Sequence, residues 1–330
     1  MPADTSTPPL RRLGRNGPLV SAIGYGAMGL SGVYGAADDA ESSRMLEQML
    51  DAGVNFLDTA DVYGQGHNEE LISGLLAKRR DDVVLATKFG ADKDTGGGRP
   101  EYVRRAVDAS LSRLGIDSID LYYLHRLDRS TPIEETVGAM AELVTAGKIG
   151  HIGLSEVGAE TLRRAHAVHP VTAVQQEYSL FTRDPEASLL PALRELGVSL
   201  VAYSPLGRGV LTGAFSDVSD VENLEERAQR YPRFEAESLR RNIELTRPLR
   251  EHAERLDLTP AQLALAWLLA QGEDVVPIPG SRRIERVREN IRASTVELDP
   301  ALIAELSDRF PPGAAAGERY HPSGMARLDQ

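Results

Sequence analysis

Eight short apolar runs, separated by amphipathic stretches, are the feature that most constrains the fold of this 330-residue chain. The runs predict β-strands over Ser21–Gly24, Asn55–Asp58, Val83–Lys88, Ile119–His125, His151–Leu154, Ala173–Gln176, Ser199–Tyr203 and Val275–Ile278. Helical patterns lie between them, among them Ala40–Ala52, Asn68–Lys78, Tyr102–Leu114, Ile133–Ala146, Glu160–Val168 and Ala187–Leu196. Repeated strand–helix units predict parallel strands joined by right-handed crossovers.

Residues at the helix boundaries support this division. Two segments have the pattern of a capping box with proline in the first turn, Thr131-Pro132-Ile133-Glu134 and Thr259-Pro260-Ala261-Gln262. A glycine follows several helices just before the next strand, at Gly53, Gly115, Gly147 and Gly197. Eight units favour one closed (β/α)8 TIM barrel over an open sheet with a second domain, because no linker or break in composition divides the chain.

Three further segments do not follow the repeat. We expect a disordered N-terminus over residues 1–9, a single barrel domain over residues 10–310 and a C-terminal tail over residues 311–330. The long polar segment Leu211–Ser238, after the seventh strand, is typical of a lid or a disordered loop. The tail is expected to fold over the barrel mouth, with a loose segment as the alternative.

Composition excludes several classes of protein. Asp and Glu number 49 against 37 Lys and Arg, and the resulting charge of −12 disfavours nucleic acids and anionic membranes as partners. The chain has no cysteine, which excludes disulfides, thiolate nucleophiles and iron–sulfur clusters. It shows no signal peptide and no run of roughly 18 to 20 apolar residues. We therefore expect a cytoplasmic protein.

Polar side chains end three consecutive apolar runs, where burial without a role would be costly. Asp58, Lys88 and His125 each end a predicted strand, and Tyr63 follows Asp58 within one short loop. Adjacent strands lie about 4.8 Å apart. The active site of a barrel lies at the carboxyl ends of its strands. We therefore expect these four side chains to converge.

Such a group would be a proton donor near neutral pH. The pKa of a free tyrosine is about 10, and the Lys88 ammonium should lower the pKa of Tyr63. Asp58 would keep Lys88 charged, and His125 would orient a carbonyl group for protonation. Each residue alone is more often structural or solvated, so the prediction depends on their coincidence. A Schiff base on Lys88 is the alternative chemistry, which Asp58 disfavours by keeping the amine protonated.

Two loops after the last strands predict phosphate sites. Val276–Arg283 leads into an apparent helix, and Ser204–Gly209 follows the seventh strand. Helix N-termini and guanidinium groups both bind phosphate, although solvated arginines are the alternative. Gly24–Gly29 matches G-x-G-x-x-G, but no helix is predicted at its third glycine, so a Rossmann fold is not indicated.

The chain resembles the aldo-keto reductase superfamily from about Leu10 to Ile291. The motifs are Leu57-Asp58-Thr59-Ala60-Asp61-Val62-Tyr63-Gly64, Ala86-Thr87-Lys88, Tyr123-Leu124-His125, Ile152-Gly153-Leu154-Ser155, Val174-Gln175-Gln176-Glu177-Tyr178-Ser179 and Ala202-Tyr203-Ser204-Pro205-Leu206-Gly207. The resemblance implies reversible, metal-free reduction of an aldehyde or ketone with a nicotinamide cofactor, usually NADPH.

The resemblance also implies a role for each site residue. Tyr63 would donate the proton, with Asp58, Lys88 and His125 in support. The cofactor would be held by Gly26, Ala27 and Met28 with Asp58, by Ser155 and Gln175 at the carboxamide, by Tyr203 against the nicotinamide, by Ser204, Leu206 and Arg208 at the pyrophosphate, and by Gly280, Ser281, Arg282, Arg286, Glu289 and Asn290 at the adenosine end. Arg282 or Arg286 near a 2′-phosphate predicts NADPH over NADH.

One residue departs from the family pattern. The usual Ser-Asn after the fifth strand is Ser155-Glu156 here, and an ionised Glu cannot donate to a carboxamide. Either Ser155 and Gln175 suffice, or Glu156 points elsewhere. A cofactor-binding regulatory or sensor subunit with slow turnover is the alternative function, which the intact group of four disfavours. The sequence leaves the substrate open, because the pocket also depends on Met28, Tyr34, the polar segment and the tail.

Overall fold

Eight parallel strands form the centre of the molecule and close into a barrel. The computed structural model describes residues 8–32, 38–91 and 97–329, so that Tyr34 lies outside the described residues. The strands neighbour one another in chain order: β3 (Tyr25–Gly26), β4 (Phe56–Asp58), β5 (Val84–Phe89), β6 (Ile119–Leu124), β7 (Ile149–Ser155), β8 (Val171–Glu177), β9 (Ser199–Tyr203) and β10 (Val275–Pro277). The predicted (β/α)8 barrel is confirmed.

The barrel closes between its first and last strands through backbone contact. The Gly24 amide donates to the Pro277 carbonyl at 2.9 Å. A Cβ atom on Gly280 would collide with the carbonyl oxygen of Gly26, so glycine at position 280 lets the two backbones approach this closely. The G-x-G-x-x-G segment therefore serves closure, and a 3-10 turn over Ala27–Ser31 follows it in place of a dinucleotide-binding helix.

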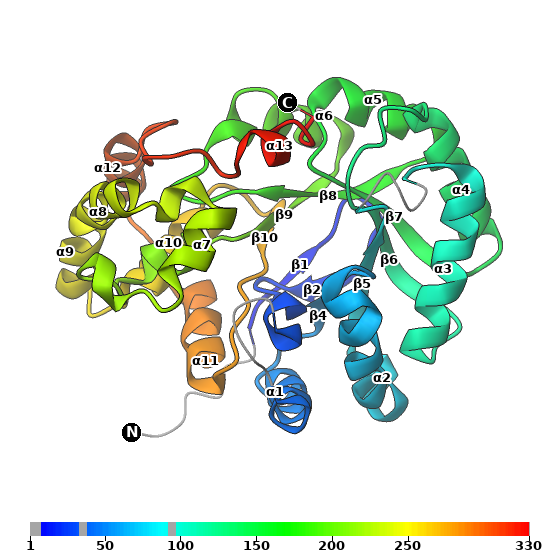
Figure 1. The fold of residues 1–330 in the computed structure, drawn as a ribbon, viewed down its shortest axis with the longest axis horizontal. Coiled ribbons are helices and arrows are strands. Elements are labelled where there is room, and N and C mark those ends of the chain that lie inside the picture. The colour runs from blue at the N-terminus through cyan, green and yellow to red at the C-terminus, as the bar shows by residue number, and fades with distance from the viewer. Residues whose placement is uncertain (1–7, 33–37, 92–96, 330) are drawn as a thin grey trace.

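Helices surround the strands (Figure 1). They are α1 (Asp39–Asp51), α2 (His67–Arg79), α3 (Pro100–Leu114), α4 (Ile133–Thr145), α5 (Ala159–Val168), α6 (Leu189–Leu196), α7 (Leu224–Arg230), α8 (Ala236–Leu245), α9 (Arg247–Arg255), α10 (Pro260–Leu269), α11 (Ile284–Arg292), α12 (Pro300–Arg309) and α13 (Pro322–Met325). Thr259 and Gln262 form the predicted capping box on α10. The box predicted on α4 is not formed, because the Thr131 hydroxyl donates to Asp128 at 2.9 Å.

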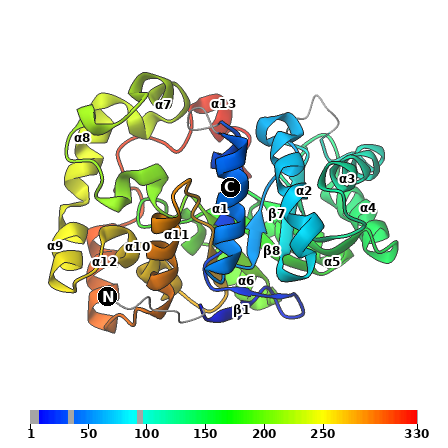
Figure 2. The same ribbon diagram turned by 90° about the horizontal axis from the view of Figure 1, so that it is seen from below.

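A hairpin that the sequence did not predict closes the bottom of the barrel. β1 (Leu10–Arg12) pairs antiparallel with β2 (Leu19–Ser21), so the strand predicted over Ser21–Gly24 is wrong, and the barrel strand begins at Tyr25. Leu13 and Val20 are fully buried and pack with the side chains inside the barrel: Phe56, Ala86, Leu121, Tyr123, Ala173, Val201, Val276 and Ile278. Figure 2 shows β1 at the end of the barrel opposite α7 and α13.

The alternation of side chains along each strand aims the polar residues at the barrel axis. Phe56, Ala86 and Tyr123 fill the interior, and the next inward position on each strand lies two residues further along. On β4 and β5 these positions are Asp58 and Lys88. On the next four strands the interior positions are Tyr123, Gly153, Ala173 and Val201. The residues two positions further along, which therefore also face the barrel axis, are His125, Ser155, Gln175 and Tyr203.

The polar segment after β9 is folded, which decides between the lid and the disordered loop of the prediction. Leu211–Ser238 contains α7, two 3-10 turns and the start of α8. Phe234 is buried, and Arg227 and Tyr231 line the cavity at the barrel mouth. The segment is therefore a structured wall of that cavity.

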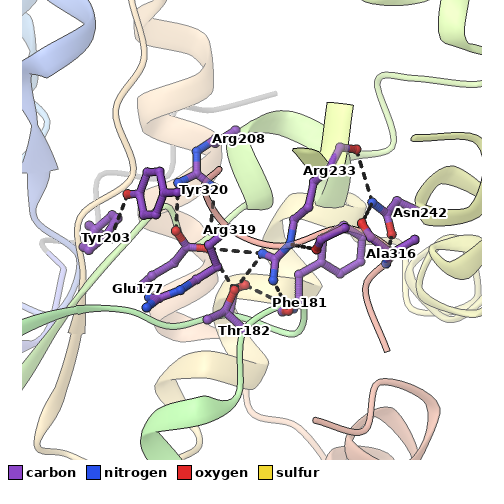
Figure 3. A network of polar contacts seen from close by, with 12 residues as sticks. Glu177, Phe181, Thr182, Tyr203, Arg208, Arg233, Asn242, Ala316, Arg319 and Tyr320 are labelled. Atoms are coloured by element: carbon purple, nitrogen blue, oxygen red, sulfur yellow. Dashed lines mark hydrogen bonds and ion pairs between the residues drawn. The ribbon is translucent and has the colours of Figure 1, made fainter. Parts of the chain in front are cut away.

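The tail crosses the mouth of the barrel beside a network of buried polar contacts (Figure 3), and the ion pair of Arg319 with Glu156 holds it there. Glu177 at the end of β8 pairs with Arg208 at 2.8 Å and Arg233 at 3.1 Å. Arg233 also donates to the tail carbonyl of Gly317, at 3.3 Å. Two residues later, Arg319 is 2 % exposed, so the tail is packed rather than loose. The domain limits predicted at residues 9 and 310 stay a prediction, although Pro8 is already buried.

Shortening Leu13 should destabilise the barrel without disrupting its fold. Leu13→Ala removes a fully buried side chain from the barrel floor and should lower the free energy of unfolding by about 3 kcal/mol. Leu10→Ala is the matched control, because Leu10 lies on the same hairpin and is 53 % exposed. Urea denaturation followed by circular dichroism measures both, and equal losses would contradict the role of the hairpin as a packed floor.

Glu177 should make stability depend on acidic pH. Burial alone would raise its pKa, but Arg208, Arg233 and Arg319 lower the pKa to about 2. Because the folded pKa lies below the unfolded value of about 4.3, the stabilisation is complete above pH 5 and is lost as pH falls toward 2. The stability difference between wild type and Glu177→Gln should shrink by about 2 kcal/mol from pH 6 to pH 3. A constant difference across this range would contradict the assignment.

Candidate active site

The four strand-end residues meet at the mouth of the barrel around a buried ion pair. The Lys88 Nζ donates to Asp58 Oδ1 at 2.5 Å and to the Thr59 carbonyl at 2.6 Å. It also lies 3.4 Å from the Tyr63 hydroxyl. Lys88 and Asp58 are 0 % and 2 % exposed. The structure thus brings the amine, the carboxylate and the phenol into one hydrogen-bonded group.

His125 completes the group as a neutral imidazole. Its ring stands edge-on to the Tyr63 ring, with the centroids 6.0 Å apart. Burial, followed by the charges of Arg126 and Lys88, holds the pKa of His125 well below its usual value. Its Nδ1 is buried and has no hydrogen-bond partner among the described residues. A neutral ring carries one N–H, which can be donated to a carbonyl oxygen.

The pKa of Tyr63 moves in the direction opposite to the prediction. Burial raises the pKa of Tyr63 above its usual value, and the Lys88 ammonium only partly offsets this effect. The expectation of a lowered pKa is therefore wrong for the site without ligands, because desolvation of a phenolate outweighs one neighbouring charge. Tyr63 is consequently a protonated phenol at neutral pH, which is the form that donates a proton.

The surroundings of Lys88 disfavour a Schiff base. Burial alone would lower the pKa of Lys88, but Asp58 and Tyr63 raise the pKa above its usual value. The amine is thus charged, fully buried and engaged with three oxygen atoms. A Schiff base requires an accessible neutral amine, so this geometry supports an electrostatic role for Lys88 instead.

A cavity of about 400 Å³ opens above these residues. Most predicted site residues line it, namely Gly26, Met28, Asp58, Tyr63, His125, Ser155, Gln175, Tyr203, Ser204, Leu206, Arg208, Gly280, Ser281 and Arg282. Five do not, namely Ala27, Lys88, Arg286, Glu289 and Asn290. Lys88 lies beneath the floor, and Arg286 pairs with Glu289 at 2.5 Å on α11.

The lining suits an elongated anionic cofactor. After β9, Ser204, Gly207, Arg208 and Gly209 all have positive φ, which turns the backbone sharply around the mouth. After β10, Gly280, Ser281 and Arg282 line the cavity just before the N-terminus of α11. Guanidinium groups and a helix start suit phosphates. Ser155 and Gln175 supply polar groups at the opposite, reacting end.

Glu156 points away from the cavity and anchors the tail. It is fully buried with a left-handed backbone, φ 54°. Both of its oxygens accept hydrogen bonds from Arg319, each at 3.0 Å. The Tyr203 hydroxyl donates to the same carboxylate at 2.7 Å and lies 3.0 Å from the Tyr320 hydroxyl. Glu156 therefore fixes the Tyr203 ring instead of contacting a carboxamide.

Ten residues of the cavity wall were not among the predicted site residues, and four of these carry a charge or an aromatic ring: Arg126, Arg227, Tyr231 and Tyr320. Arg126 had a local signal, because it directly follows His125 at a strand end. Tyr320 had none, because the pairing that places it joins positions 163 residues apart. In the described parts of the chain no three His, Asp or Glu side chains gather as a metal site would require. Among the helices described, none is long and apolar enough to cross a membrane.

Comparison with known proteins connects this site to one family. Residues 22–308 match the Aldo/keto reductase family. An aldo-keto reductase of Schizosaccharomyces pombe, named with NADP(+), is 42% identical over 97% of this chain and 96% of its own. A probable aldo-keto reductase of Glycine max is 45% identical over 94% of this chain and 91% of its own.

Solved structures agree. A thermostable aldo-keto reductase in complex with the inhibitor epalrestat has a TM-score of 0.76 at 32% identity, covering 91% of this chain and 99% of that one. A glycerol dehydrogenase of Gluconobacter oxydans has a TM-score of 0.81 at 26% identity, covering 95% and 98%. The predicted family, fold and carbonyl-reducing oxidoreductase class are confirmed. The chain belongs to the aldo/keto reductase family.

Proposed function

We propose that this protein reduces an aldehyde or ketone with NADPH and that Tyr63 supplies the proton. One observation carries the proposal. A protonated phenol and a neutral imidazole face one cavity above a charged, fully buried Lys88. The nicotinamide, when bound, supplies the hydride to the carbonyl carbon.

The residues of the chain provide the proton and the orientation. His125 would donate its N–H to the carbonyl oxygen and so hold the carbonyl beside Tyr63. As negative charge develops on that oxygen, the Tyr63 proton moves to it. The Lys88 ammonium, 3.4 Å from the phenol oxygen, stabilises the phenolate left behind. Asp58 keeps Lys88 charged and in place, and the reverse steps oxidise an alcohol.

The proposed cofactor residues follow the mouth from the reacting end to the adenosine end. Ser155 and Gln175 would bind the carboxamide, and Gln175 is held by its donation to Asp58 at 2.7 Å. Tyr203 would stack on the ring, Ser204 and Leu206 would contact the pyrophosphate, and Arg282 would take a 2′-phosphate. The cytoplasmic location and the absence of nucleic-acid or membrane partners stay predictions.

Tyr63→Phe should remove the proton donor and leave cofactor binding intact. We expect kcat to fall by about 100- to 10,000-fold with an aldehyde panel, because a positioned general acid contributes that much. NADPH absorbance measures turnover, and fluorescence titration measures cofactor binding. Tyr231→Phe is the control, since this tyrosine lines the same cavity without a contact to Lys88. Full activity of Tyr63→Phe would refute the role, and a wild type inert to all aldehydes and ketones would refute the reaction.

NADPH should bind more tightly than NADH. Arg282→Met should raise the Kd of NADPH by about 10- to 100-fold, the worth of a charge-assisted hydrogen bond to phosphate, and should change the Kd of NADH little. Arg288→Met is the control, because Arg288 is exposed on α11 and does not line the cavity. Arg286→Met tests the alternative 2′-phosphate ligand. Comparable wild-type Kd values for the two cofactors would contradict the preference.

A further inference from the structure

Arg126 lies at the reacting end of the cavity, apart from the residues proposed for the cofactor phosphates. Arg126 directly follows His125 at the end of β6 and lines the cavity with Tyr63. We propose that Arg126 binds a carboxylate of the substrate, so that the preferred substrate is an aldehyde or ketone that also carries a carboxylate. This inference rests on the carbonyl reduction proposed above.

The guanidinium is anchored through one nitrogen, which leaves the others for a ligand. Its Nη1 donates to the His125 carbonyl at 2.7 Å and to the Ser155 hydroxyl at 3.3 Å. Its Nη2 and Nε have no protein partner in the described residues, and neither is a fully buried atom. Two adjacent N–H groups in one plane match the two oxygens of a carboxylate.

No protein carboxylate neutralises Arg126 within ion-pair distance in the part of the chain that the structure describes. The acids around the mouth have other partners. Asp58 pairs with Lys88, Glu156 with Arg319, and Glu177 with Arg208 and Arg233. Glu156 acts on Arg126 only from beyond ion-pair distance, so a bound anion would give Arg126 a direct counterion.

The position of Arg126 separates it from the cofactor phosphates. The proposed phosphate ligands follow β9 and β10, whereas Arg126 follows β6. In the order of the barrel β6 lies four strands from β10, which is the opposite side of an eight-stranded mouth. The charge of Arg126 also acts on Tyr63, His125 and Tyr203, all at the reacting end. A carboxylate on Arg126 would therefore lie only a few bonds from the carbonyl.

Matched pairs of substrates test the inference with the NADPH-supplied enzyme. The 2-, 3- and 4-formylbenzoates each have a neutral counterpart in their methyl ester, and the three isomers vary the distance between carboxylate and carbonyl. For at least one isomer we expect kcat/KM of the acid to exceed that of the ester by about tenfold or more. Arg126→Met should reduce this acid-to-ester ratio by about 10- to 100-fold.

Two further variants separate charge from geometry. Arg126→Lys keeps the charge but loses the planar pair of donors, so its ratio should fall between those of wild type and Arg126→Met. Arg240→Met removes the same charge from an exposed position of α8 and should keep the wild-type ratio. An acid-to-ester ratio of one for all three wild-type isomers, or an unchanged ratio in Arg126→Met, would overturn the inference while leaving carbonyl reduction intact. Reduction of neither acid nor ester would remove the proposed function, and the inference with it.

Calorimetry gives a readout that needs neither turnover nor a variant. Benzoate should bind the wild type saturated with NADP+ at least about tenfold more tightly than the neutral isostere benzamide. The difference should vanish in Arg126→Met, if that variant folds. Equal affinities of benzoate and benzamide for the wild type would count against a carboxylate site even if no variant could be purified.

Discussion

The buried ion pair between Lys88 and Asp58 is the interaction on which the rest of the site depends. Moving two charges out of water costs several kcal/mol per ion, and here both side chains are almost fully buried. The strand alternation that fills the barrel with Phe56 and Ala86 forces the next inward residues into this position. Thr59 and Gln175 supply the hydrogen bonds that make the burial tolerable. A pair of this kind adds little stability, so we infer that it is kept for the positive charge that it holds beneath Tyr63.

A second layer of buried charge connects the barrel to the end of the chain. Glu156 departs from the family pattern, but its buried charge is neutralised, because Arg319 donates a hydrogen bond to each of its carboxylate oxygens. Glu177 in the neighbouring strand is matched by Arg208 and Arg233 in the same way. The tail that brings Arg319 also brings Tyr320 into the cavity wall. The Glu at position 156 and the tail therefore form one unit, and neither is explained without the other.

What the sequence predicts well is what repeats or what is local. The alternation of strands and helices specifies the barrel, and three strand-end residues in phase specify the polar group around Lys88. The hairpin escapes prediction because its strands have three residues each and carry no periodic signal. The Glu156–Arg319 pair escapes because it joins positions 163 residues apart. The direction in which the pKa of Tyr63 shifts could not be predicted, because it depends on the depth of burial, which the spacing of residues does not reveal.

The negative net charge of the chain does not predict the charge of the ligands that its cavity suits. At −12 the protein as a whole repels anions, but that repulsion is screened beyond about 8 Å at physiological salt. Within the mouth the sign reverses, because among the described residues the cavity lining includes four arginines and one acid, Asp58. Lys88 neutralises Asp58, and Glu177, which does not line the cavity, pairs with one of the arginines, Arg208. Cations stand after β6 on one side and after β9 and β10 on the other. In the function proposed above, a phosphorylated cofactor would account for the second group only, which is why we assign the first group to the substrate.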